Sequence, residues 1–164
     1  MTNPIPEDWH IFMDQYSPMM SVIRQLAKQD WYVREGWTAF LGHYHAGIYL
    51  QVFKPHWFNH TGDGIHLETG LTAETLQNRA TGIDLHITHK NLFDRDRFNA
   101  YATPRMKALV ESWPDEIWFK EHTVSERLGL SVRFTKTNFP QQMAAAFTRL
   151  SALGPIIDAG LAQL

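Results

Sequence analysis

The chain has 164 residues, of which 44% are hydrophobic and 20% charged, and its formal net charge is −2 with nine neutral histidines. This length and composition predict one globular domain covering residues 1–164, and they exclude a disordered or fibrous chain. The chain has no cysteine. Disulfide scaffolds, thiol nucleophiles and cysteine-ligated metal sites are therefore excluded.

Charge and hydropathy patterning argue against a membrane span and against a polynucleotide partner. Lysines and arginines are scattered singly, with no basic run that would neutralise a phosphate backbone. No window approaches the ~18 uninterrupted apolar residues of a transmembrane helix. The first ten residues lack the basic and apolar regions of a signal peptide, so we expect a cytoplasmic protein.

The chain begins with a helical pattern. Apolar residues recur at three- and four-residue spacing from Trp9 to Leu26, and Ser17-Pro18 is typical of a helix start. The pattern ends near Lys28. It predicts either one helix kinked at Pro18 or two short helices.

Four β-rich segments follow. Residues 38–43 and 48–53 flank a connection of hairpin length, whereas residues 54–64 are predicted to form a loop. Residues 65–71 and 83–88 alternate most clearly between apolar and polar side chains, which predicts one buried and one polar face. A short helix could begin at Thr72, but the interval is too short to favour a crossover, so we expect antiparallel pairing.

The second half of the chain predicts a helix, two strands and a C-terminal helix. Asp94 is a plausible cap for a helix interrupted at Pro104, and strands are expected at 117–121 and 128–134. A helix opens at Asn138-Phe139-Pro140, and a further short helix completes the chain. Because strands and helices come in runs, we predict an α+β fold: a mainly antiparallel sheet of five to six strands with helices packed on one face.

Imidazole and carboxylate groups share the polar faces of two predicted strands. His66 and Glu68 lie two residues apart on one strand, and Asp84 and His86 lie two apart on the other. If the strands pair, these groups form a cluster that suits a divalent metal, and an open ligand position could activate water. One hypothesis is therefore a metal-assisted hydrolase or nuclease.

Other observations weaken this hypothesis. Exposed strand faces hold polar residues of every kind, and the chain has no HExxH motif. The acidic-x-lysine pair of many nucleases is incomplete, since Asp84-Leu85-His86 lacks the lysine and Lys90 comes six residues after Asp84. Two further histidine pairs, His43/His45 and His56/His60, have ligand-like spacing, but the second pair lies in the predicted loop.

Aromatic residues are concentrated between Trp31 and Phe58. Most of them are expected in the core, because large apolar side chains usually are. The remainder would form a binding surface or an oligomer interface. Trp57 and Phe58 in the predicted loop, with Tyr44 and Tyr49 of the hairpin, are the expected anchors of that surface.

No nucleophile elbow or phosphate-binding glycine loop is present. The leading hypothesis is therefore a small cytosolic, non-enzymatic binding protein that needs no cofactor and contacts a protein partner or a second copy of itself. The metal hypothesis requires His66, Glu68, Asp84 and His86 to converge. Spacing alone does not determine this, because it depends on strand register.

Overall fold

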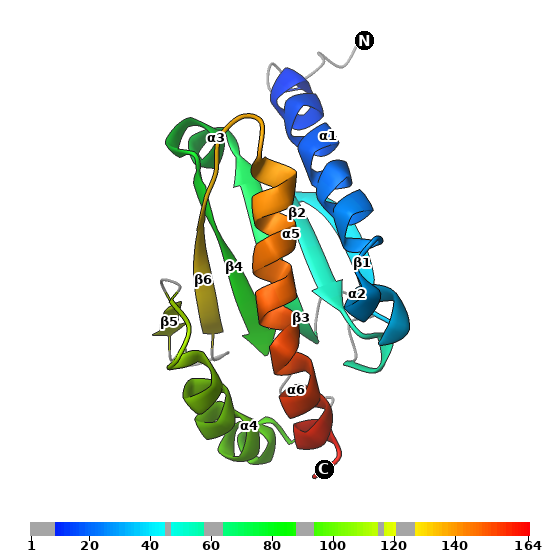
Figure 1. Ribbon diagram of the computed structural model, residues 1–164, viewed down its shortest axis with the longest axis vertical. Coiled ribbons are helices and arrows are strands. Elements are labelled where there is room, and N and C mark those ends of the chain that lie inside the picture. Colours follow the sequence, from blue (N-terminus) through cyan, green and yellow to red (C-terminus); the bar gives the residue numbers. More distant parts are fainter. Residues whose placement is uncertain (1–8, 45–46, 58–63, 88–93, 115–116, 121–126) are drawn as a thin grey trace, which may run out of the picture.

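The computed structural model describes residues 9–44, 47–57, 64–87, 94–114, 117–120 and 127–164 (Figure 1). One antiparallel sheet has six strands in the order β1-β2-β3-β4-β6-β5. The strands are β1 (Thr38–Tyr44), β2 (Gly47–Phe53), β3 (Ile65–Thr72), β4 (Ala80–Ile87), β5 (Ile117–Lys120) and β6 (Arg127–Arg133). The predicted α+β fold with an antiparallel sheet is confirmed.

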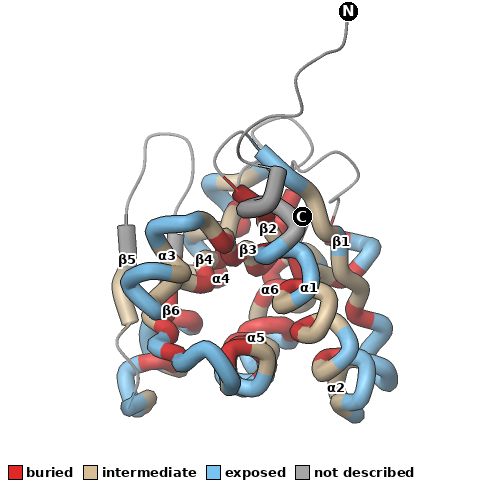
Figure 2. Tube along the Cα trace, turned by 90° about the horizontal axis from the view of Figure 1, so that it is seen from above, coloured by how far each residue is buried: buried red, intermediate tan, exposed pale blue. Residues whose placement is uncertain are grey.

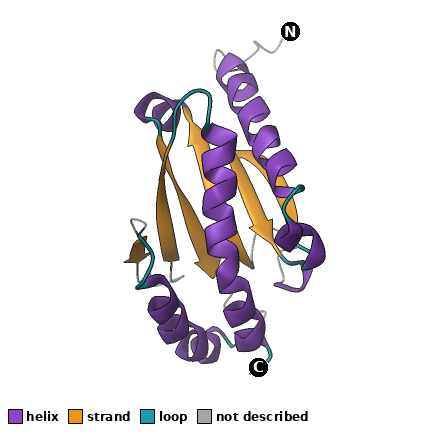
Figure 3. Cartoon of the chain, in the orientation of Figure 1, coloured by secondary structure: helices purple, strands orange, loops and turns teal. Residues whose placement is uncertain are grey.

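Figure 3 shows helices lying in front of the strands and at one end of them. In the sequence, the helices come before, between and after the strands. They are α1 (Trp9–Leu26), α2 (Asp30–Arg34), α3 (Ala73–Asn78), α4 (Arg95–Val110), α5 (Phe139–Leu150) and α6 (Gly154–Leu161), with 3₁₀ turns η1 (Pro55–Trp57) and η2 (Ser151–Leu153). Helix α1 is one helix that contains Pro18. None of the helices in the described segments is long and apolar enough to cross a bilayer.

Alternation along the strands separates a core face from a polar face. Most residues on the core face of β2, β3, β4 and β6 are apolar and buried, including Leu50, Leu67, Leu85 and Leu130. Figure 2 shows α1 and α5 on one side of the curved sheet. Their buried side chains, such as Val22 and Phe147, join those of the strands in one core. Burial of each such side chain stabilises the fold by about 1.5–3 kcal/mol.

Local signals explain where two of the helices begin. Thr72 and Thr75 form a capping box at the start of α3, and the Asp94 carboxylate accepts a hydrogen bond from the backbone N–H of Arg97 at the start of α4. Helix α4 packs against α6 at one end of the sheet (Figure 1).

Candidate metal centre on the polar face of the sheet

The polar face is the side of the sheet formed by the residues that alternate with the core residues of β2, β3 and β4. Strand register brings its polar side chains into two adjacent rows. Glu68 of β3 lies between Gln51 of β2 and Asp84 of β4, and His66 lies opposite His86. Antiparallel pairing therefore gathers residues of different strands that lie at least 15 positions apart in the sequence.

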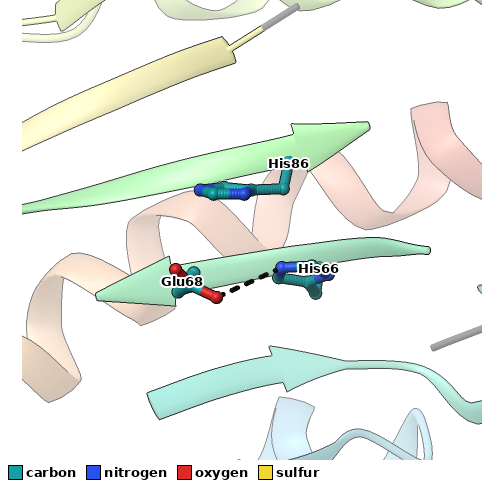
Figure 4. A group of neighbouring side chains, drawn as sticks. All are labelled: His66, Glu68 and His86. Atoms are coloured by element: carbon teal, nitrogen blue, oxygen red, sulfur yellow. Dashed lines mark ion pairs between the residues drawn. The ribbon is translucent and has the colours of Figure 1, made fainter. Parts of the chain in front are cut away.

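His66, Glu68 and His86 converge (Figure 4). Each offers one nitrogen or oxygen atom, and these three atoms all lie within 4.8 Å of one another. The two imidazole rings are stacked, with centroids 5.0 Å apart and planes 27° apart. Two imidazoles and one carboxylate are a donor set that zinc and other divalent transition metals accept.

Gln51 orients the side chains of Glu68 and His66 by contacting one atom of each. Its Nε2 atom lies 2.8 Å from Glu68 Oε2 and 3.3 Å from His66 Nε2. The amide nitrogen only donates, and the reverse orientation would place the amide oxygen against the carboxylate, so Gln51 favours the His66 tautomer with an unprotonated Nε2. When His66 Nε2 carries a proton it donates to Glu68 Oε2, 3.4 Å away, and without that proton the two atoms face each other as two acceptors. A cation between them would stabilise that arrangement.

The Glu68 carboxyl is held in its ionised form. Burial raises its pKa, but the hydrogen bonds with His66 and Gln51 lower it. The charges of His86 and His66 lower it further, and the net result is a pKa below the ordinary glutamate value. At neutral pH the carboxylate is therefore available as a ligand without losing a proton.

His66 is the most deeply buried member of the group. Its side chain is 1% exposed, whereas that of Glu68 is 28% exposed. Within the described part of the chain, His66 Nδ1 has no hydrogen-bond partner. Buried polar atoms in proteins are almost always paired, and this nitrogen is one of the exceptions.

The structure brings three of the four residues of the predicted cluster together. His66, Glu68 and His86 converge. Asp84 lies opposite Glu68 in the register, but its carboxylate is not one of the three converging donors. Gln51, which sequence reasoning missed, completes the group. A polar amide at a buried position of an otherwise apolar strand, IYLQVF, was the signal that could have found it.

The predicted aromatic anchors of the binding surface differ in their exposure. Tyr44 is 36% exposed and Tyr49 is partly buried; their ring centroids lie 6.2 Å apart. Burial and the Glu68 charge both raise the pKa of Tyr44. The expectation of an exposed Trp57 is wrong: its side chain is 0% exposed and packs edge-on against Trp37. Phe58 lies outside the described residues.

Trp57 also belongs to a polar network that sequence reasoning did not find. The Asp158 carboxylate of α6 accepts hydrogen bonds, each 2.7 Å long, from Lys54 Nζ and Trp57 Nε1, and His56 Nε2 lies 2.7 Å from it. Lys54 is itself buried and also pairs with Glu35 at 3.5 Å. His56 therefore binds to Asp158, while its predicted partner His60 lies outside the described residues, as does His45.

Comparison with known proteins identifies no relative of the chain. No family model matches the chain, and no curated protein matches its sequence.

Proposed function

We propose that the chain is a metal-assisted hydrolase in which His66, Glu68 and His86 bind one divalent transition metal ion. The convergence of these three donors within 4.8 Å supports this proposal. Three protein ligands leave at least one position for water, and a bound divalent ion lowers the pKa of that water toward neutrality. A metal ion held by these residues would polarise an ester or phosphoester and would carry the water that attacks it.

Metal binding is tested by calorimetry on protein stripped with a chelator, using Zn²⁺, Mn²⁺ and Mg²⁺ separately. We expect one equivalent of a transition metal to bind. Glu68→Gln and His86→Gln should weaken the affinity by about 100-fold, because each removes one of three ligands. His56→Gln, a change of the same kind outside the cluster, should leave the affinity unchanged.

Hydrolysis is tested in the same preparations with p-nitrophenyl acetate and bis-p-nitrophenyl phosphate. Turnover should require the metal and should fall with metal occupancy in Glu68→Gln and His86→Gln. A protein that binds no ion, or that binds it equally well in all three variants, contradicts the proposed metal centre. Metal binding without hydrolysis of either ester contradicts the hydrolase.

A non-enzymatic binding protein is the second candidate. Phe40 and Tyr44, which are 50% and 36% exposed, support it, because both lie on the edge strand β1 next to Tyr49. Exposed aromatic side chains at a sheet edge suit a protein partner or a second copy of the chain. This candidate predicts association that substitutions on β1 weaken.

A further inference from the structure

Strand β6 extends beyond the strand that lies outside it. Strand β4 pairs with all of β6, Arg127–Arg133, whereas among the described residues β5 pairs only with its first part, Arg127–Leu130. Figure 1 shows β5 beside one end of β6. Residues 131–133 therefore form an edge of the sheet among the described strands.

The backbone hydrogen-bonding groups of this edge point away from β4. The N–H of Phe134 donates to the carbonyl oxygen of Arg79 at 3.0 Å, so the backbone of Phe134 faces β4. Backbone groups of successive residues in an antiparallel strand face opposite sides. Those of Arg133 and Ser131 therefore face outward, and they offer N–H donors and C=O acceptors at the spacing of a strand ladder.

A groove of about 190 Å³ lies between this edge and α5. It is lined by residues 130–133 of β6 and by Gln142, Ala145, Ala146 and Arg149 of α5, and we call it the edge groove. The two alanines leave room beside the strand. Pockets for small molecules usually measure about 300–1,000 Å³, so the edge groove is better suited to the side chains of an added strand.

The charged residues around the edge groove have one sign. Arg133 and Arg149 border it and are exposed, and no described aspartate or glutamate lines it. At Ala145 and Arg149 it adjoins a more open hollow of about 690 Å³, whose lining includes Trp113. The guanidinium carbon of Arg149 lies 5.9 Å from the centroid of the Trp113 ring, and Arg149 is the one charged residue among those that line this hollow in the described segments. The charges therefore favour an anionic ligand.

We propose that the edge groove binds an extended acidic peptide, which adds a strand beside residues 131–133 of β6. The outward backbone groups supply main-chain hydrogen bonds, and the groove receives the peptide side chains that point toward α5. A carboxylate of the peptide pairs with Arg149, because a guanidinium group binds a carboxylate through two parallel hydrogen bonds. Helix α5 covers the core side of the sheet (Figure 2), so this proposal is independent of the metal centre on the polar face.

Calorimetry with blocked peptides tests the proposal. The probes are acetyl-Val-Glu-Val-Glu-Val-amide and the same peptide with lysine in place of glutamate. We expect the acidic peptide to bind about tenfold or more tightly at low salt. Two further acidic peptides carry N-methyl groups on alternate amides. The form whose methyl groups face β6 should not bind, and the bound parent peptide should slow hydrogen exchange at the amides of Ser131 and Arg133.

Two substitutions, each with a matched control, locate the binding site. Ala145→Leu fills the edge groove from an exposed position and should weaken the acidic peptide by about tenfold. Arg149→Glu should remove the preference for the acidic peptide over the basic one. Ala27→Leu and Arg24→Glu make the same changes at exposed positions outside the groove and should alter neither property.

An acidic peptide that does not bind at millimolar concentration would overturn the proposal, as would equal binding of the acidic and basic peptides or of both N-methylated forms. Peptide binding that Ala145→Leu leaves intact would show that the site is elsewhere and would overturn the edge groove. If the free protein dimerises and Ala145→Leu abolishes the dimer, the groove holds a second copy of the chain, and the assignment to an acidic peptide is wrong.

Discussion

Two buried glutamines differ in what surrounds their amide groups. Gln51 is 4% exposed, and its amide donates to Glu68 at the edge of the proposed metal centre. Gln15 of α1 is 0% exposed, and neither of its amide atoms has a hydrogen-bond partner among the described residues. A buried amide that is paired orients its neighbours, whereas one that is unpaired only destabilises the fold.

Leucine substitutions of the two glutamines should therefore change different properties: metal affinity for Gln51 and stability for Gln15. Gln51→Leu should weaken metal affinity by about 10- to 100-fold, because it removes the group that orients Glu68 and His66. Gln15→Leu should leave metal affinity unchanged and raise the free energy of unfolding by about 1–3 kcal/mol, because the unpaired amide is no longer buried. Calorimetry and urea denaturation measure the two quantities. Equal loss of metal affinity in both variants would contradict an orienting role for Gln51.

At the scale of an element, Asp158 attaches helix α6 to the end of β2 and to η1. Burial raises the pKa of its carboxyl, but hydrogen bonds from Lys54, Trp57 and His56 lower it. The Lys54 charge lowers it further, and the net pKa lies below the ordinary aspartate value. A carboxyl whose pKa is lower in the folded state stabilises the fold above its unfolded pKa, and this stabilisation is lost as pH falls through the folded pKa.

Asp158→Asn should consequently reduce stability at neutral pH, by about 2 kcal/mol, because buried Lys54 loses a charged partner. The carboxylate is 34% exposed, so solvent moderates the loss. Urea denaturation across pH measures it. The difference between wild type and variant should shrink as pH falls below about 4, the ordinary aspartate range. A difference that is constant from neutral to strongly acidic pH would contradict the ionised network.

Prediction from sequence succeeded where the signal is local and failed where a distant residue decides the environment. The strands at 65–71 and 83–88 were predictable because alternation is a local signal, and antiparallel pairing followed from the short interval between them. Trp57 was not predictable from its neighbours. Its indole N–H donates to Asp158, which lies 101 positions further along the chain, so the environment that buries Trp57 is not visible in the neighbouring sequence.

The candidate site was predictable in its residue types but not in its geometry. The sequence shows that His66 and Glu68 share one face, and Asp84 and His86 another. A register shifted by two residues would have separated these pairs, and no local signal fixes the register. The observed pairing selects His66, Glu68 and His86 and adds Gln51 from a third strand. Helix α2, with only five residues and none buried, was likewise too short to predict.

At the scale of the whole molecule, the two edges of the sheet differ. Strand β5 has four residues and ends in Lys120, whereas β1 has seven residues with no lysine, arginine, acidic residue or proline. Charged residues, proline and shortness are the features that protect an edge strand from pairing with another chain. The β1 edge lacks all of these, and it presents Phe40 at 50% exposure.

Self-association through β1 is therefore the whole-molecule prediction of the second candidate function. A two-fold axis at Gly42 would pair Phe40 of each copy with Tyr44 of the other, because antiparallel strands place such residues opposite each other. Phe40→Lys should weaken the dimer by about tenfold, because it removes two aromatic pairs and adds charges to an apolar contact. Sedimentation over a range of concentrations measures this. Leu164→Lys, at a residue of similar exposure near the C-terminus, is the matched control. A wild-type protein that stays monomeric at all concentrations, or a dimer that both substitutions weaken equally, would rule out pairing through this edge.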